Sequence, residues 1–349
     1  MKFGLFLPTL TGWSHTDEDR DGGFRIRYER THEICELAEE LGFDFVTLGQ
    51  HRFTPQGVDP SAPLTVLSAL AARTHSLRLV TNIVILGAHN PVEIAEQVAT
   101  IDEMSGGRVI LGVGLGYRPY EFESIGLDYR QRVSRFEEAV EVVRRCWSGK
   151  PVSFDGQHFT IDKAEISPLP FQRPGPPIWV GAQAEKAVMR AARIGDGWLT
   201  DNVFSATAFV PLIERYRAEA ADYGTSGIVA MNRKVAIGRS RKYVEEKWLP
   251  QVLDFFREFP ALGAVFDDKV FMEKLMSGKN LGLDDVPDDQ FIGGTPDDCI
   301  RSLRKVERLT GCDYIVADFG SGAHGQQFED LKSSIELFGR TVIPEFIER

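Results

Sequence analysis

The chain has 349 residues, of which 43% are hydrophobic and 26% are charged, and its formal net charge at pH 7 is −11. A chain of this length has enough apolar side chain for a large core and folds either as two domains or as one α/β barrel. An acidic protein without basic runs is poorly suited to bind nucleic acid or a membrane surface, so an anionic ligand would have to be held by local groups such as helix N-termini.

The cysteines and the N-terminus give no sign of export or of a metal site. The four cysteines form no CxxC pair, and none lies near a histidine at zinc-binding spacing. We therefore expect reduced, mostly buried thiols in a cytoplasmic protein without a metal. The initial run MKFGLFLPTL is short and broken by Pro8, which favours a first β-strand over a signal peptide. No stretch approaches the ~20 apolar residues that span a bilayer.

Apolar runs and helical periodicities alternate along the chain. Short runs of the strand type cover residues 2–8, 43–48, 77–86, 108–113, 178–181, 197–200, 229–238 and 313–319. Segments with helical spacing of apolar residues cover 24–41, 61–74, 90–105, 132–147, 184–194, 209–223, 293–309 and a last helix after residue 325. At the start of one of them, Asn90 is the expected N-cap and Pro91 the first helical residue.

This alternation predicts a parallel (β/α)8 barrel, an α/β TIM barrel, as one domain over residues 1–349. A doubly wound open sheet is the alternative. Two insertions are expected at the C-terminal face of the barrel. Residues 150–176 are typical of a surface hairpin with Asp155-Gly156 as its turn. Residues 239–290 break the alternation and predict two helices that form a lid.

A glycine-rich strand exit is the most unusual feature of the sequence. Residues 105–117 read SGGRVILGVGLGY, so that Gly112, Gly114 and Gly116 alternate at the end of a buried strand. Because glycine weakens a strand, this pattern indicates that something approaches the backbone closely. A ligand and simple crowding inside the barrel both remain open. In a barrel of this kind the chemistry lies at the C-terminal ends of the strands, where His51 and Asn82 also fall.

Five motifs in this order resemble the bacterial luciferase-like monooxygenase superfamily. They are GLFLP (4–8), FDFVTLGQHRF (43–53), NPVEIAEQVATIDEMSGGRVILGVGLGY (90–117), PPIWVGAQAEKAVMRAA (176–192) and GDGW (195–198). The resemblance covers residues 2–202 well and 291–349 loosely. It implies a flavoprotein oxidoreductase that uses either reduced FMN with oxygen or coenzyme F-420 as a hydride carrier.

The resemblance assigns a role to His51, which matches a proton-transfer histidine of luciferase. Its neighbours Gln50 and Arg52 both depart from the Glu-His-His form of the family motif. A histidine titrates near neutrality, which suits proton transfer. A residue that only lines the pocket or bonds to its rim is the other interpretation. Many members have a non-proline cis peptide under the cofactor ring, and the matching bond here is Asn82–Ile83.

The cofactor phosphate of the family matches a helix N-terminus in this chain. The backbone there comprises Gly181, Ala182, Gln183 and Ala184, whose amides and helix dipole would suit an anion. Luciferase adds an arginine after its fourth strand, but this chain has Leu115, and Arg118 or Arg132 would have to replace it. Luciferase also carries a thiol where this chain has Gly114, so luminescence is not expected. Candidate substrate-wall residues are Trp13, Tyr117, Trp198 and Phe319, although Trp198 equally suits a core position.

The resemblance therefore favours a two-component monooxygenase, in which a separate flavin reductase supplies reduced FMN and a small organic substrate is oxygenated. Hydride transfer with coenzyme F-420 is the alternative within the family, and a barrel that binds a ligand without turnover is a second one. A metal-dependent barrel hydrolase is disfavoured because the first strand lacks the His-x-His pair. We also expect a homodimer, because this is common in the family.

Overall fold

The structure, a computed structural model, describes residues 1–7, 18–53, 60–258, 267–320 and 328–347. The chain divides into two compact units that alternate along the sequence. Unit 1 comprises Met1–Val46, Thr200–Ala218 and Ile228–Arg349, and unit 2 comprises Thr47–Leu199 and Glu219–Gly227. The expected single domain over residues 1–349 stays a prediction.

Unit 2 contains parallel strands in the order β2-β3-β5-β8-β9. Their bounds are β2 (Phe45–Leu48, whose last two residues lie in this unit), β3 (Arg78–Thr81), β5 (Val109–Gly114), β8 (Ile178–Gly181) and β9 (Gly197–Leu199), and the short β4 (Val84–Ile85) pairs with β5. Every residue of β5 is buried, as its continuous apolar run predicts. The helices of the unit are α2 (Pro63–Ala71), α3 (Pro91–Ser105), α4 (Tyr120–Glu123), α5 (Arg132–Cys146) and α6 (Glu185–Ile194).

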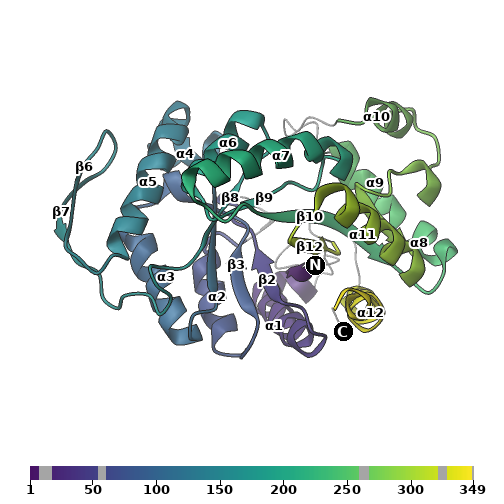
Figure 1. Cartoon of the computed structure of the whole chain (residues 1–349). Helices are drawn as coiled ribbons and strands as arrows, with labels where there is room; N and C mark the ends of the chain where they lie inside the picture. Colours follow the sequence, from purple (N-terminus) through teal and green to yellow (C-terminus); the bar gives the residue numbers. More distant parts are fainter. Residues whose placement is uncertain (8–17, 54–59, 259–266, 321–327, 348–349) are drawn as a thin grey trace. The chain divides into compact units, whose positions relative to one another are not determined.

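Helix α3 shows how closely the local sequence determines its ends. Asn90 Oδ1 accepts the backbone N–H of Val92 at 3.0 Å, and Pro91 follows as the first helical residue. Gly106 ends the helix with a φ of +67°, a left-handed conformation that glycine adopts without steric cost. The hairpin predicted after α5 is also present. It consists of the antiparallel strands β6 (Val152–Asp155) and β7 (Thr160–Ala164), which extend beyond α5 at the left of Figure 1.

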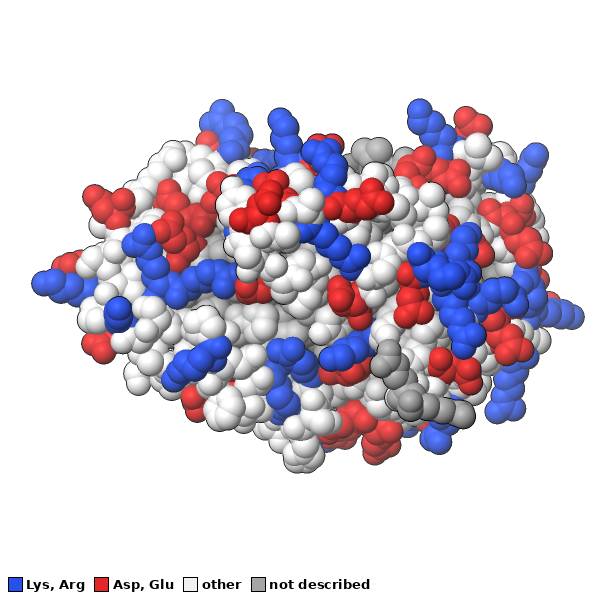
Figure 2. Space-filling view, viewed as in Figure 1, with Lys and Arg blue, Asp and Glu red and all other residues white. Residues whose placement is uncertain are grey.

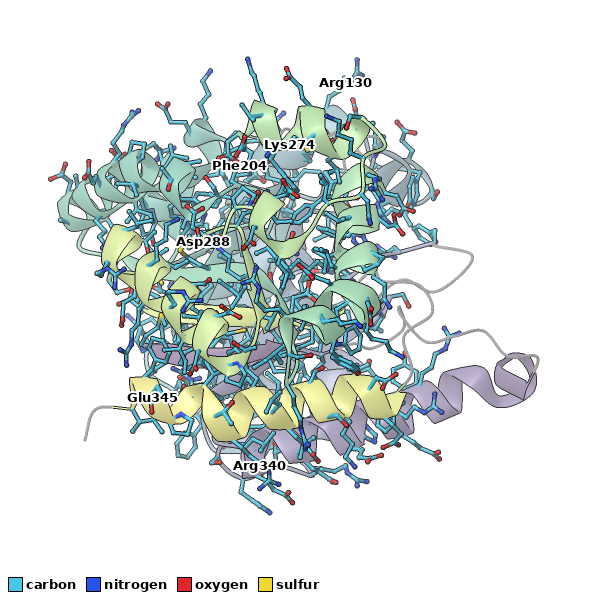
Figure 3. All side chains as sticks on the ribbon, turned by 90° about the vertical axis from the view of Figure 1, so that its right-hand side faces the viewer. Arg130, Phe204, Lys274, Asp288, Arg340 and Glu345 are labelled. Atoms are coloured by element: carbon cyan, nitrogen blue, oxygen red, sulfur yellow. The ribbon has the colours of Figure 1, made fainter. Side chains whose placement is uncertain are left out.

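Unit 1 contains four parallel strands in the order β11-β10-β12-β1. They are β1 (Lys2–Phe6), β10 (Ile228–Ile237), β11 (Phe291–Gly294) and β12 (Tyr314–Asp318). The helices that follow are α1 (Glu18–Glu40), α7 (Ala206–Tyr223, which continues into unit 2), α8 (Arg241–Lys247), α9 (Leu249–Glu258), α10 (Lys269–Met276), α11 (Pro296–Thr310) and α12 (Phe328–Thr341). Helix α12 runs beside α1 (Figure 3). Lys332 Nζ lies 2.6 Å from Glu33 Oε1.

Two sequence predictions in unit 1 were wrong. Gly293 and Gly294 do not begin a helix: they end strand β11, which pairs with β10, and α11 starts only at Pro296. A four-residue strand with two glycines carries little strand signal of its own. The segment 239–290 contains α8, α9 and α10 in its described part rather than two helices. Their apolar side chains, including Trp248, pack into a core cluster of their own.

The alternation of parallel strands and helices is that of a (β/α)8 barrel, which confirms the fold class predicted from the sequence. Strand β11 is additional to the eight predicted strands. Among the described residues, none of the helices is long and apolar enough to cross a membrane. On the face shown in Figure 2, acidic and basic side chains are interspersed rather than gathered in a patch of one sign.

The glycines at the exit of β5 are explained by crowding within the protein. A Cβ on Gly112 would lie 1.7 Å from the carbonyl oxygen of Thr81, and one on Gly114 would lie 2.9 Å from Cδ1 of Ile83. Gly116 has a φ of +71°, which L side chains rarely adopt. Of the two interpretations left open by the sequence, close approach of the protein's own backbone and side chains accounts for all three positions.

We predict that Gly112→Ala strongly destabilises the protein. The added methyl group would overlap a backbone atom of β3 that cannot move without breaking the sheet, so the loss should be about 3 kcal/mol or more in the free energy of unfolding. Gly282→Ala is the matched control, because its Cβ would meet only the end of the Glu245 side chain at 3.3 Å. Urea titrations should place the control within about 1 kcal/mol of the parent. Equal stability of both variants would contradict the crowding explanation.

Candidate functional site

The C-terminal ends of four strands of unit 2 lie next to one another. The backbone N–H of Asn82, directly after β3, donates to Leu48 O at the end of β2 at 2.7 Å. At the ends of β5 and β8, Gly114 and Gly181 are paired in register. Thr81 Oγ1 also donates to Gly112 O at 2.7 Å and fixes β3 against β5. Asn82, Gly114 and Gly181, three of the predicted site residues, therefore lie on one edge of the sheet.

The peptide bond between Asn82 and Ile83 is cis, as the resemblance predicted. The side chain of Ile83 lies against the two paired glycines, because a Cβ on Gly114 or Gly181 would meet it at 2.9 or 3.1 Å. Ile83 is only partly buried and packs on the apolar cluster that contains Ile85 and Phe122. The result is a half-exposed aliphatic surface at the strand ends.

His51 is held by a buried carboxylate that the sequence analysis did not identify. Its Nδ1 lies 3.3 Å from Oε1 of Glu121, a residue of the short helix α4. The same oxygen accepts the backbone N–H of Arg52 at 2.9 Å. The side chain of Glu121 has no exposed surface, whereas that of His51 is 18% exposed. The ring of Tyr117 stands edge-on to the imidazole, with centroids 5.8 Å apart.

This arrangement selects one tautomer of His51. A carboxylate only accepts hydrogen bonds, so the proton of a neutral imidazole is held on Nδ1, facing Glu121. The other nitrogen, Nε2, is then the one that can accept a proton. Oε2 of Glu121 is buried and has no hydrogen-bond partner among the described residues. The His51 contact and the hydrogen bond from the Arg52 amide therefore help to offset the cost of removing this carboxylate from water.

Gln50 links the strand ends instead of taking part in acid–base chemistry. Its Nε2 donates to Ser61 O at 2.7 Å, and its Oε1 accepts the backbone N–H of Ile85 at 2.9 Å. The same oxygen lies 3.2 Å from Nε2 of His89. Because an amide oxygen cannot donate, His89 must carry its proton on Nε2. Gln50, which departs from the family motif, thus forms a hydrogen bond with a second histidine, His89. The sequence analysis did not identify His89 as a site residue.

The predicted phosphate-binding stretch forms the entry to α6. The backbone N–H of Ala182 donates to Leu199 O. Ala184 is the N-cap residue, and its side chain makes no capping hydrogen bond. The first amides of a helix have no partner within it, so those around Gln183 can serve an anion. Glu185 lies in the first turn and opposes such binding. Leu115 supplies no charge and is half-buried.

Neither candidate arginine is held at the α6 entry by a hydrogen bond that the structure shows. Arg132 Nη1 donates to Tyr129 O at 3.2 Å, and its guanidinium lies 4.0 Å from the centroid of the Tyr129 ring. Arg118 Nη1 donates to the hydroxyl of Tyr120 at 3.0 Å and lies 5.2 Å from the Tyr117 ring centroid. Their assignment to the phosphate stays a prediction.

The candidate wall residues differ in position. Tyr117 is 45% exposed beside His51, as a pocket residue requires. Trp198 is fully buried, and its indole N–H donates to Ala182 O at 2.8 Å, which suits the core position that the sequence left open. Phe319 belongs to unit 1 and is 5% exposed. Trp13 lies outside the described residues.

The residues present fit a planar cofactor with a phosphate. The aliphatic surface of Ile83 between two glycines suits the face of a ring system, and the uncapped start of α6 suits a phosphate. In the part of the chain that the structure describes, no group of three or more His, Cys, Asp or Glu side chains could hold a metal ion. The fold and this edge of the sheet are those of a TIM barrel with a candidate cofactor site at its strand ends.

Comparison with known proteins identifies the family. The family model described as luciferase-like monooxygenase matches residues 1–312, and the chain belongs to that family. It is 29% identical to a 5,10-methylenetetrahydromethanopterin reductase of Archaeoglobus fulgidus, with 99% of each chain covered. An FMNH2-dependent dimethylsulfone monooxygenase of Pseudomonas putida is 30% identical over 66% of this chain and 64% of that protein.

A solved structure has the same fold over the whole chain. The monooxygenase RslO1 of Streptomyces bottropensis superimposes with a TM-score of 0.83 at 24% identity, over 99% of this chain and 100% of that one. Members of the family use reduced FMN or coenzyme F-420, which agrees with both cofactors expected from the sequence. The protein is thus a flavin- or F-420-dependent oxidoreductase.

We predict that His89 makes the stability of the protein depend on pH. Burial, with a smaller contribution from Arg52, lowers the pKa of His89 from 6.5 to about 4. Between pH 6.5 and pH 4, His89 is protonated in the unfolded chain but not in the folded one. Its contribution to the free energy of unfolding is therefore fully present above pH 6.5 and is lost as the pH falls towards 4. The loss between pH 7 and pH 5 should be about 2 kcal/mol in the free energy of unfolding.

The measurement compares urea titrations of the parent and of His89→Gln at both pH values. Glutamine can still donate to Gln50 Oε1 but does not titrate. The variant should lose about 2 kcal/mol less than the parent over this interval. An identical pH dependence in both proteins would show that His89 is not the group responsible.

Proposed function

We propose that the protein is the oxygenase of a two-component monooxygenase, which receives reduced FMN from a separate flavin reductase and oxygenates a small organic substrate. The bound reduced flavin supplies the electrons that activate oxygen. The FMN-dependent monooxygenase among the relatives supports this choice. The residues that would hold the cofactor are Ile83, Gly114 and Gly181 under its ring, and the amides around Gln183 at its phosphate.

The observation that carries the proposal is the contact between His51 and Glu121. A histidine whose Nδ1 donates to a buried carboxylate carries its lone pair on Nε2, in the manner of the base in a catalytic triad. Glu121 acts as a positioning residue, since it holds the imidazole in one tautomer. Tyr117 forms a wall on the exposed side of His51. These residues would hold and move a proton at Nε2.

Hydride transfer with coenzyme F-420 is the second candidate, because a relative at 26% identity is an F420-dependent glucose-6-phosphate dehydrogenase of Nakamurella multipartita. A proton acceptor held like His51 would serve an alcohol substrate as well as a monooxygenase. A barrel that binds a ligand without turnover is the third possibility raised by the sequence. The homodimer and the location in the cytoplasm stay predictions.

Titration of the protein with each cofactor separates these candidates. Reduced FMN, added under anaerobic conditions, should bind at micromolar concentration, as measured by its fluorescence, while coenzyme F-420 should bind at least tenfold more weakly. Gly181→Val is the control, because its side chain would collide with Ile83 and block the ring surface. Preferential binding of F-420 would replace the first proposal by the second. Binding of neither would contradict both.

We predict that Glu121→Gln changes the tautomer of His51. A hydrogen bond to a charged group contributes about 1.5–3 kcal/mol, so the parent should hold the proton on Nδ1 with a preference of about tenfold to a hundredfold. A glutamine must keep its oxygen at this position to accept the Arg52 N–H, but the charge is lost, so the preference for Nδ1 should fall and a larger share of His51 should carry its proton on Nε2. Side-chain ¹⁵N resonances of histidine-labelled protein report the tautomer directly, and His51→Gln assigns them.

Glu123→Gln is the matched control for this substitution. Glu123 lies two residues further along the same helix and is exposed, so its loss should leave the His51 resonances unchanged. The titration with reduced FMN should be similar for both glutamine variants. A His51 that already carries its proton on Nε2 in the parent would contradict the assigned role of Glu121.

A further inference from the structure

Arg118, which follows the exit of β5 in unit 2, has no carboxylate partner. It is half-buried and forms no ion pair with any carboxylate of the described residues. A guanidinium keeps its charge at every physiological pH, so Arg118 carries a positive charge that no directly bonded carboxylate neutralises. Other arginines of this unit do contact carboxylate oxygens: Arg130 lies 2.8 Å from Asp128, Arg144 2.9 Å from Asp196 and Arg190 2.6 Å from Glu137.

Two tyrosines hold the guanidinium of Arg118 in place. Nη1 donates to the hydroxyl of Tyr120 at 3.0 Å, and Cζ lies 5.2 Å from the centroid of the Tyr117 ring, within the range of a cation–π contact. The hydroxyl of Tyr129 donates to Tyr117 O at 3.1 Å and so fixes the backbone beneath that ring. Arg118 is therefore positioned by neutral groups, which leave its charge available to a ligand.

One edge of this guanidinium can be reached from solvent. Nε and Nη2 of Arg118 have no hydrogen-bond partner within the described residues, and neither belongs to the buried polar atoms that lack one. The two N–H groups of this edge point in parallel. Their spacing matches the two oxygens of a carboxylate, which an arginine binds through two hydrogen bonds at once.

The Tyr117 ring connects Arg118 with His51. The ring stands edge-on to the imidazole at a centroid distance of 5.8 Å, and the guanidinium lies on its other contact at 5.2 Å. These two legs place Arg118 Cζ no more than 11.0 Å from the imidazole centroid. An extended chain advances roughly 1.2 Å per bond, so an acid of about six carbons that lies along the Tyr117 ring would reach from Arg118 to His51.

The charges next to His51 favour an anionic ligand. Glu121 is the carboxylate in contact with His51, whereas Arg52 and Arg118 both lack an ion pair within the described residues. These side chains thus carry an excess of positive charge in a chain whose formal net charge is −11. Because an acidic protein repels anions at long range, such a local excess is what would hold an anionic substrate.

We propose that Arg118 binds the carboxylate of the substrate, so that the substrate is a small organic acid rather than a neutral or basic molecule. The reaction of this acid next to His51 rests on the proposed function, but its binding requires no flavin. Arg118 is then a residue of the substrate site and does not hold the cofactor phosphate, the other role considered for it from the sequence.

The experiment follows the Nε–H resonances of protein labelled with ¹⁵N-arginine, in which Arg118→Gln assigns the resonance of Arg118. The probes are hexanoate, hexanesulfonate, 1-hexanol and hexylamine, which share a chain length and differ in the head group. Hexanoate should shift the Arg118 resonance and the ring resonances of His51 over the same range of concentration. Its affinity should be at least tenfold higher than those of the other three probes.

The variant Arg118→Gln should weaken hexanoate binding at least tenfold, as followed at the His51 ring. The matched control is Arg130→Gln, which removes the same charge from a side chain that is 88% exposed. Its affinity for hexanoate should stay within twofold of that of the parent.

Three outcomes overturn the inference. Binding of hexanol as tight as that of hexanoate would contradict the argument from charge, and equal binding of hexanesulfonate would contradict recognition of the planar carboxylate. Unchanged affinity in a folded Arg118→Gln protein would place the acid elsewhere. If that variant instead lost affinity for reduced FMN alone, Arg118 would serve the cofactor phosphate.

The titrations contain no flavin, so this inference and the proposed function can fail separately. Hexanoate binding at Arg118 in a protein that binds neither cofactor would keep the acid site and refute the proposed function. Binding of reduced FMN without any saturable effect of hexanoate would do the reverse.

Discussion

The candidate site depends on the close approach of β3 to β5. The carbonyl oxygen of Thr81 lies where a Cβ of residue 112 would be, and the Thr81 hydroxyl bonds to Gly112 O. This contact is possible only with glycine at that position. It determines where the chain leaves β3, and so it places Ile83 against Gly114 and Gly181. Because Gly114 and Gly181 have no side chains, the aliphatic side chain of Ile83 can lie against both strand ends.

The second constraint is the burial of one carboxylate. Glu121 has no exposed surface and receives one backbone N–H and one imidazole nitrogen. An ionised group in such a place is stable only if its neighbours supply donors or charges, and His51 is the imidazole that contacts it directly. The geometry of His51 is therefore a consequence of burying Glu121. A short helix of four residues is sufficient to bring the carboxylate there.

Much of the fold could be predicted from the sequence because its signals are local. The run before Gly112 is apolar and long enough for a buried strand, and Asn90 with Pro91 marks a helix start. Strand β11 could not be predicted, since its four residues include two glycines and gain their order only from pairing with β10. The sequence could not decide between crowding and a ligand at Gly112, because that choice needs the position of a backbone atom in another strand.

The site could be predicted only in part, for the same reason. His51, Asn82 and Ile83 were found through a resemblance carried by contiguous motifs. Glu121 is 70 residues from His51 and lies in no such motif, so nothing short of the fold connects them.

The two units hold buried ionisable pairs of different chemical character. Lys234 and Asp318 form an ion pair of a lysine and a carboxylate, with 2.8 Å between Nζ and Oδ2, and both side chains are buried. His51 and Glu121 pair an imidazole with a carboxylate, and a neutral imidazole has one nitrogen that donates a proton and one that accepts a proton. The first kind of pair can orient a neutral group without exchanging protons with it, whereas the second can exchange them.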